Sequence, residues 1–324
     1  MTKLVAVDIG GTNARFCIAE VAGGEIALGQ QVTLPTSDYV SLATAWEAFA
    51  AQANEPVPHA AAIAIAAPLA GRIVRMTNNN WVIDRDTLAA TLGLDRLTLV
   101  NDFEAVAHAV AQAPTSDFVH ICGPDVPLPP VGTISVVGPG TGLGVAHFYR
   151  SPTETHVQAT EGGHIDFAPV DPVDDAILAR LRALHGRVST ERVNSGPGIA
   201  VIYAVLCELE RRTPTLEGDR AIWQAALSGE DLMASAALAR FCMTLGSVAG
   251  DFALAQGASG VVLAGGIGLK LRDHLPASAF ADRFAFKGRY EALMSGLPVK
   301  LIVQREPGLY GAVAAFLQQH GSTT

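Results

Sequence analysis

Two consecutive polar residues, Asn101 and Asp102, follow a short apolar run and precede a helical pattern. The run at residues 97–100 has strand character, and apolar residues at helical spacing begin with Phe103. Open α/β sheets bind ligands at the carboxyl ends of their strands, so these two side chains are candidates for contacting a substrate. The simpler interpretation is that Asn101 or Asp102 only caps the helix that follows.

A glycine-rich turn near the N-terminus is a candidate phosphate site. Residues 4–7 predict a buried strand that ends in Asp8, and Gly10, Gly11 and Thr12 then turn into a second strand. The turn amides and the Thr12 hydroxyl could hold a phosphate, although a hairpin turn needs no such function. Asp8 strengthens the hypothesis, because a carboxylate beside a phosphate loop is a suitable anchor for hydrated Mg²⁺.

The same order of strand, turn and strand recurs at residues 133–146. Its turn aligns with residues 8–12, and Pro139 within it has no N–H to donate. The remaining amide donors would be Gly140, Thr141 and Gly142. Two such turns at equivalent points predict a duplicated unit, with one nucleotide clamped between two lobes.

A loop at residues 160–167 carries Glu161 and His164 on either side of two glycines, which we expect to make it flexible. The two side chains differ in hydrogen-bonding character, which suits sugar hydroxyls. His164 and Asp166 could also contribute to a metal site, but no third ligand is spaced to complete it, so we favour sugar contacts.

Glu191 follows a predicted helix start in which Ser189 is the N-cap. An acid in the first turn of a helix is explained by the helix dipole alone. The local pattern alone therefore does not require a functional role for Glu191.

The remaining pattern supplies the elements that would position these residues. Further strands are expected at residues 25–34, 61–66, 261–263 and 299–303, and helices at 41–52, 86–92, 231–256 and from Pro307 onward. The strand at 261–263 ends in Gly265 and Gly266, whose exposed backbone could accept a flat ring such as adenine. The helix from Pro307 is expected to pack on the N-terminal lobe.

Composition narrows the class of protein. The chain has 324 residues, enough for two domains at ~150 residues each. The net charge of the chain is -9, and the chain lacks the stripe of basic residues that is typical of nucleic-acid-binding proteins. Its apolar runs are shorter than the ~20 residues of a membrane-spanning helix. We therefore expect a cytoplasmic protein without nucleic-acid or membrane partners. The four cysteines are far apart in the sequence, so we expect reduced thiols. We expect a homodimer, because a symmetric dimer is the commonest assembly.

Taken together, the motifs resemble the bacterial glucokinase family, in that family's order and over nearly the whole chain. The resemblance rests on residues 8–15, 101–103, 140–144, 161–164, 191–192, 195–198 and 264–266. It implies an α/β, two-lobed actin-like ATPase (ribonuclease H-like) fold of duplicated βββαβαβ units with a cleft between them. The expected lobes are residues 1–112 with 306–324, and residues 113–305.

The resemblance also implies ATP and Mg²⁺ as cofactors and glucose as the acceptor, in the first step of glycolysis. Asp102 is then the base for the sugar 6-hydroxyl. Its other implied sugar contacts are Asn101, Glu161, His164 and Glu191. The implied ATP contacts are Val7, Asp8, Ile9, Gly10, Gly11, Thr12, Gly140, Thr141, Gly142, Gly265 and Gly266, with Asp8 holding Mg²⁺ through water.

Two other classes of function are alternatives to a sugar kinase. A sugar-sensing regulator would bind without turnover, but the absence of a DNA-binding segment and the presence of Asp102 both argue against it. The zinc-binding cysteine cluster and the added helix-turn-helix of the related repressor and sugar-kinase group are also missing. An actin-like or chaperone-like ATPase would act through protein partners. Release of ADP only when a hexose is present would distinguish a sugar kinase from both.

Overall fold

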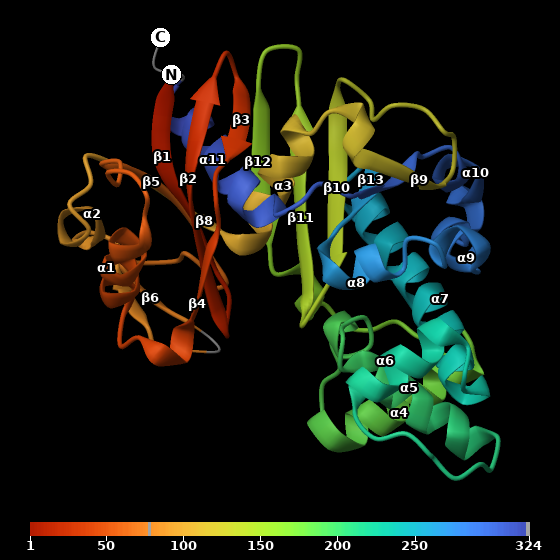
Figure 1. Cartoon of the computed structure of the whole chain (residues 1–324). Coiled ribbons are helices and arrows are strands. Elements are labelled where there is room, and N and C mark those ends of the chain that lie inside the picture. Colours follow the sequence, from red (N-terminus) through yellow and green to blue (C-terminus); the bar gives the residue numbers. More distant parts are fainter. Residues whose placement is uncertain (77–78, 322–324) are drawn as a thin grey trace. The chain divides into compact units, whose positions relative to one another are not determined.

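The computed structural model of the chain describes residues 1–76 and 79–321 (Figure 1). It divides into two compact units. Unit 1 comprises Met1–Ala113 and Gln304–Thr324, and unit 2 comprises Pro114–Val303. The last three residues of the smaller expected lobe, 322–324, lie outside the described residues.

Unit 1 is built on a twisted sheet in the order β3-β2-β1-β5-β8, with β4 also paired to β2. Its strands are β1 (Thr2–Ile9), β2 (Asn13–Ala22), β3 (Glu25–Leu28), β4 (Val32–Pro35), β5 (Ala60–Ile65) and β8 (Arg96–Asn101). The first three are antiparallel, and β1, β5 and β8 are parallel. The parallel strands consist mainly of apolar residues, as expected for strands covered on both faces.

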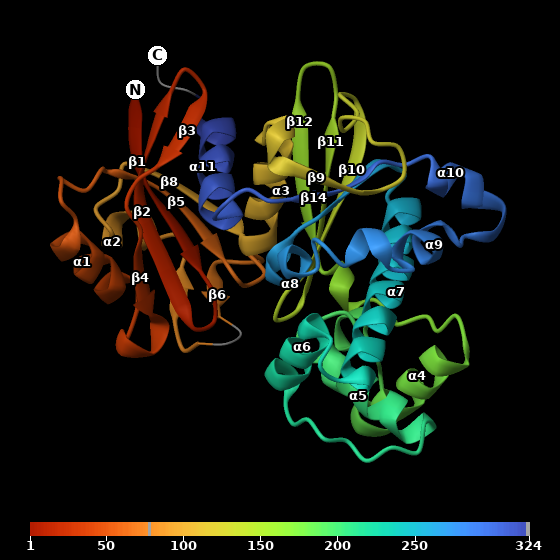
Figure 2. The same ribbon diagram turned by 45° about the vertical axis from the view of Figure 1, so that its right-hand side comes forward.

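Helices cover both faces of this sheet (Figure 2). Accordingly, alternate side chains of β1 enter two different hydrophobic cores. Val5 and Val7 pack with α1 (Leu42–Gln52) and α2 (Leu88–Thr91), whereas Leu4 and Ala6 pack with α3 (Asp102–Gln112) and α11 (Pro307–His320). The backbones of α11 and α3 are so close that a Cβ on Gly311 would overlap Ala105 O. The C-terminal helix is thereby anchored on the N-terminal sheet.

The prediction of a single third strand at residues 25–34 is wrong. The structure has two short strands there, and both pair with β2. Leu28 is opposite Ala19 and Val32 is opposite Phe16, which is four steps along one chain against three along the other. One extra residue therefore bulges out, and the ladder is interrupted.

Unit 2 repeats the same strand plan in the order β12-β11-β10-β13-β14-β9. Its strands are β9 (Phe118–Cys122), β10 (Gly132–Pro139), β11 (Leu143–Arg150), β12 (Thr155–Thr160), β13 (Ala258–Leu263) and β14 (Val299–Ile302). Again three antiparallel strands are followed by two parallel ones. The added edge strand β9, and a small hairpin of β6 (Ile73–Arg75) and β7 (Val82–Asp84) in unit 1, were not predicted.

The helices of unit 2 surround one large core. They are α4 (Pro172–His185), α5 (Gly198–Leu209), α6 (Asp219–Ser228), α7 (Leu232–Ala255), α8 (Gly265–Lys270), α9 (Phe280–Ala285) and α10 (Glu291–Ser295). The length and composition of α7 would allow it to cross a membrane, but 67% of its apolar 18-residue stretch is buried inside the protein. It is therefore the core helix that its apolar spacing predicted.

Candidate active site

The carboxyl ends of the three parallel strands of unit 1 are level with one another. In the sheet register, Ile9 of β1 is beside Ile65 of β5, which is beside Asn101 of β8. Adjacent strands are about 4.8 Å apart, so β1 and β8 end at the same edge, roughly 10 Å from each other. The structure thus brings the turn at residues 10–12 and the pair Asn101 and Asp102 to one edge of unit 1.

Hydrogen bonds hold the turn at residues 10–12. Gly10 N donates to Asn13 O at 2.9 Å, and Thr36 Oγ1 donates to Gly11 O at 2.9 Å. The backbone of Gly10 is not left-handed, and the nearest described atom to an added Cβ, Asn13 O, would be 3.6 Å away. Local packing therefore does not require glycine at position 10, and the missing side chain leaves room for a ligand.

Two of the residues assigned to ATP belong to the core of unit 1. The side chains of Val7 and Ile9 are fully buried, and Ile9 O accepts a hydrogen bond from Ala66 N at 2.9 Å. Thr12 is exposed at the tip of the turn. Of the three, only Thr12 presents its side chain to a ligand from solution.

Asp8 forms an ion pair across the β1–β2 ladder. Arg15 Nη1 is 3.1 Å from Asp8 Oδ2, and Arg15 Nε is 3.9 Å from Glu306 Oε2. The first turn of α11 also approaches, since a Cβ on Gly308 would be 3.0 Å from Asp8 Oδ2. Burial raises the pKa of the Asp8 carboxyl above its usual value, while the positive charge of Arg15 acts in the opposite direction.

The surroundings of Asp8 fit a hydrated magnesium ion rather than an all-protein metal cage. Among the described residues, no group of three or more His, Cys, Asp or Glu side chains is placed to hold a metal. Mg²⁺ is commonly bound by one or two carboxylates, several waters and the phosphates of a substrate. A single carboxylate with 18% of its side chain exposed, next to a phosphate-type turn, meets that requirement.

Asn101, and not Asp102, caps α3. Asn101 Oδ1 accepts hydrogen bonds from Phe103 N at 2.9 Å and Glu104 N at 3.2 Å. The Glu104 carboxylate accepts a hydrogen bond from Asn101 N at 3.2 Å, which completes a capping box. Asn101 Nδ2 donates to Ala67 O at 3.3 Å, so both ends of its amide already have partners within unit 1.

Asp102 is the first residue of α3, and its Oδ1 accepts from Phe103 N at 2.8 Å. The helix does not need this carboxylate as its cap, because Asn101 fills that position. The cap interpretation is therefore confirmed for Asn101 alone, and Asp102 is an additional acid at the strand end.

In unit 2, the turn at residues 140–142 contacts Glu191. Gly140 N donates to Gly142 O at 2.8 Å, so this amide is used within the turn and is not the ligand donor expected from the sequence. Leu143 N donates to Glu191 Oε2 at 2.9 Å. The helix predicted to start at Ser189 is only a 3₁₀ turn, Thr190–Arg192, and Ser189 makes no side-chain cap. Glu191 is thus positioned by the glycine turn rather than by a helix dipole.

Glu161 and His164 flank the 3₁₀ turn Gly162–His164. Their side chains are 63% and 58% exposed, and His164 Nε2 is 3.9 Å from Glu161 Oε2. The expected flexibility of the intervening glycines is wrong: a Cβ at Gly163 would overlap Leu143 O, and one at Gly162 would come within 2.9 Å of Val145. These glycines allow the loop to pack tightly on β11.

Gly265 and Gly266 follow β13 beside the second glycine turn. Gly265 has φ +81°, and an added Cβ would be 2.7 Å from Pro139 O, so packing alone explains this glycine. At Gly266 and at Gly140, an added Cβ meets no described atom within 4 Å. The fold therefore leaves open space at these two positions, whereas a Cβ at Gly10 would be in ordinary contact with Asn13 O.

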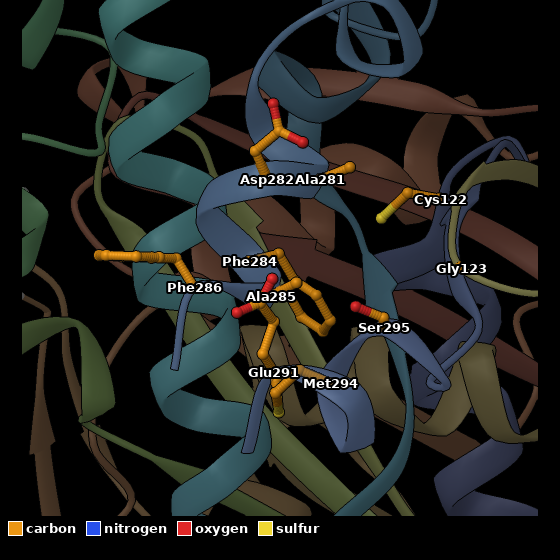
Figure 3. Close-up of a pocket in the computed structure, with 10 residues that line it drawn as sticks. All are labelled: Cys122, Gly123, Ala281, Asp282, Phe284, Ala285, Phe286, Glu291, Met294 and Ser295. Atoms are coloured by element: carbon orange, nitrogen blue, oxygen red, sulfur yellow. The ribbon is translucent and has the colours of Figure 1, made fainter. Parts of the chain in front are cut away.

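A cavity of about 340 Å³ lies elsewhere in unit 2, among β9, α9 and α10 (Figure 3). Its walls are formed by Cys122, Gly123, Ala281, Asp282, Phe284, Ala285, Phe286, Glu291, Met294 and Ser295. None of these residues was predicted to bind glucose or ATP. The predicted residues instead form two sets, one on each unit.

The sequence analysis did not identify the residues that hold the predicted site residues in place. Arg15 had no assigned role, although its cross-strand pairing with Asp8 follows from counting outward from the turn. Thr36 and Thr190 hold the turn at residues 10–12 and the loop at Gly163, respectively. No local pattern pointed to either threonine, because their partners are 25 and 27 residues away.

Comparisons with known proteins agree on one family. The glucokinase family model matches residues 4–320. The glucokinase of Zymomonas mobilis is 52% identical over 98% of this chain and 98% of its own. The crystal structure of a glucokinase from an Antarctic psychrotroph has a TM-score of 0.86 and 33% identity, covering 98% of this chain and 99% of the other.

A more distant structure, at 18% identity, shares the fold. It is a ROK family glucokinase from Streptomyces griseus in complex with glucose and AMPPNP, with a TM-score of 0.62, covering 96% of this chain and 98% of the other. These likenesses confirm the predicted actin-like ATPase fold. The chain belongs to the glucokinase family, whose activity is the phosphorylation of glucose.

Proposed function

We propose that the chain transfers the γ-phosphoryl group of ATP in line to the 6-hydroxyl of glucose, at the entry to glycolysis. The observation that carries the proposal is the division of roles at the start of α3, where Asn101 is the cap and Asp102 is a separate acid. Additional support comes from the Streptomyces griseus protein, whose structure contains glucose and an ATP analogue.

Asp102 is assigned as the general base. Its Oδ1 accepts from Phe103 N at 2.8 Å, which orients the carboxylate at the end of β8. In phosphoryl transfer the protein mainly positions the reactants and stabilises charge, and an aspartate accepts the proton of the attacking hydroxyl. A positioned base of this kind contributes ~10² to 10⁴ in rate.

The phosphates are assigned to the two glycine turns, at residues 10–12 and 140–142. The open space at Gly140 and the absence of a clash at Gly10 support this, because neither position needs a glycine for its own packing. Asp8 would hold Mg²⁺ through water, and the ion would supply positive charge to the phosphates when bound. Gly266, which also has open space, is assigned to the adenine side.

The remaining sugar hydroxyls are assigned to Glu161, His164, Glu191 and Asn101. Glu161 and His164 are well exposed, and among the described residues their side chains form an ion pair or hydrogen bond only with each other, at 3.9 Å, so both can rearrange toward a ligand. Asn101 Oδ1 is held by the cap, and Asn101 Nδ2 donates one of its two N–H groups to Ala67 O, so its second N–H is the donor we assign to the sugar.

The direct test is the release of ADP from purified protein with Mg-ATP, measured with each of a panel of hexoses and without sugar. We expect ADP to appear with glucose and only at a low rate without it, because closed sugar kinases exclude water as an acceptor. ADP release independent of sugar would support a partner-driven ATPase, and sugar binding without ADP release would support a regulator. Either outcome would overturn the proposal.

A further inference from the structure

The carboxylate of Glu191 lies directly on the turn at residues 140–142. Leu143 N donates to Glu191 Oε2 at 2.9 Å, and an added Cβ at Gly142 would overlap that same oxygen. Among the described residues, none donates a hydrogen bond to the second oxygen, Oε1. One oxygen of this half-buried side chain is therefore committed to the turn, and the other is open to a ligand.

The backbone around Glu191 connects two parts of unit 2. Before it, Thr190 Oγ1 donates to Gly163 O at 2.8 Å, which holds the loop that carries Glu161 and His164. After it, Gly196 N donates to Gly140 O at 2.8 Å. Residues 190–196 thus contact both the loop assigned to glucose and the turn assigned to ATP.

We propose that Glu191 couples glucose binding to ATP binding within unit 2. Its Oε1 would accept a hydrogen bond from a sugar hydroxyl while its Oε2 holds Leu143 N, so a bound sugar would favour the conformation of the turn at residues 140–142 that receives phosphate. This inference rests on the proposed function for both ligand assignments. It adds a route by which one ligand changes the affinity for the other.

The coupling has a defined thermodynamic form. A ligand shifts a conformational equilibrium only by its differential affinity for the two states, and the effect between two ligands is reciprocal. Couplings of this kind are typically 5- to 150-fold in affinity. We expect glucose to strengthen binding of AMPPNP with Mg²⁺ by about tenfold in the unmodified protein, and AMPPNP to strengthen glucose binding by the same factor.

Two glycines of the same turn provide a matched test. Gly142→Ala puts a methyl group where Glu191 Oε2 lies, so the carboxylate must leave Leu143 N while remaining in the protein. Gly140→Ala puts a methyl group into open space and leaves that hydrogen bond intact. Calorimetry would give the dissociation constant of AMPPNP, with and without saturating glucose, for each protein.

We expect the ratio of the two constants to fall to near one in Gly142→Ala and to stay near the unmodified value in Gly140→Ala, even if AMPPNP binds the latter more weakly throughout. An unchanged ratio in a folded Gly142→Ala protein would overturn the inference, and so would a ratio of one in the unmodified protein. If Gly142→Ala does not fold, Glu191→Ala replaces it, because that variant also removes the contact with Leu143 N.

A second measurement separates coupling from a purely structural role. Hydrogen exchange at the Leu143 amide should slow when glucose binds the unmodified protein, and this response should disappear in Gly142→Ala. If Glu191 only stabilises the turn, glucose will leave exchange at Leu143 unchanged. Normal glucose affinity in Glu191→Ala would instead remove Glu191 from the sugar site, which contradicts the proposed function for this residue.

Discussion

Arg15 and Asp8 are directly opposite each other in the β1–β2 ladder, with Nη1 of Arg15 3.1 Å from Oδ2 of Asp8. The arginine side chain is 43% exposed and the aspartate only 18%. Among the described residues, Arg15 is the positive charge that pairs with the carboxylate that we assign to Mg²⁺, and it is 3.9 Å from a second acid, Glu306.

Replacing Arg15 by methionine should destabilise the protein modestly, by about 1 kcal/mol, because the pair is partly exposed and solvent screens it. Mg²⁺ with AMPPNP should raise the melting temperature of Arg15→Met more than that of the unmodified protein, since the ion replaces the missing positive charge beside Asp8. Arg15→Lys, which keeps the charge, is the control. Equal shifts in all three proteins would show that Arg15 does not act as a counter-charge to Asp8.

Asp102→Asn should lower kcat by at least ~10², since it removes the basic oxygen that a general base needs. Its melting temperature and glucose affinity should change little, because Asn101 caps α3. The matched variant Asn101→Ala should instead lose about 1 kcal/mol of stability by removing the cap. Near-normal turnover in Asp102→Asn would end the assignment of Asp102 as the base.

Gly140→Ala should fold normally but weaken AMPPNP binding by roughly tenfold, equivalent to about 1.4 kcal/mol, because the added methyl group would occupy ligand space. Gly163→Ala is the contrasting variant: its methyl group would overlap Leu143 O, so we expect a clear drop in melting temperature. If Gly140→Ala binds AMPPNP normally, the phosphate is not held at this turn.

Glu161→Ala and His164→Ala should each raise the KM for glucose by roughly 10- to 100-fold, the effect of losing a hydrogen bond that involves a charged or polar partner. Both side chains are exposed, so melting temperatures should not change. The affinity for AMPPNP without glucose should also be unaffected. Calorimetry that found weaker AMPPNP binding with normal glucose binding would contradict the assignment.

Stability should fall in mild acid because of His108. Burial on α3 lowers the pKa of this histidine from 6.5 to about 4, so the folded protein holds it neutral. As the pH falls from 6.5 toward 4, the unfolded chain binds the proton first, and the folded state loses stability. In urea unfolding, His108→Gln should remove about 2 kcal/mol of the loss between pH 7 and pH 4.5. An identical pH dependence in the two proteins would contradict the burial effect, because the other titrating groups, including Glu104, are the same in both.

The sequence by itself determined the elements whose signals are local. Short apolar runs that end in a glycine turn predicted β1 and β10, and helical spacing predicted α1, α3 and α7, because these patterns reflect hydrogen bonds and burial within a few residues. The glycine turns after β1 and β10, and the polar pair after β8, were visible for the same reason. The order of these motifs was enough to indicate the family.

The tertiary structure decided what each polar residue and glycine does. Only packing shows that Asn101 is the cap while Asp102 is a separate acid. Likewise, only packing shows that Gly142 and Gly163 are close-packed while Gly140 faces open space. The contact between Glu191 and Leu143 joins residues 48 apart, and the bulge that splits β3 from β4 depends on their pairing with β2. Such features arise from long-range contacts and close approaches of backbone, which a period of 2 or 3.6 residues does not encode.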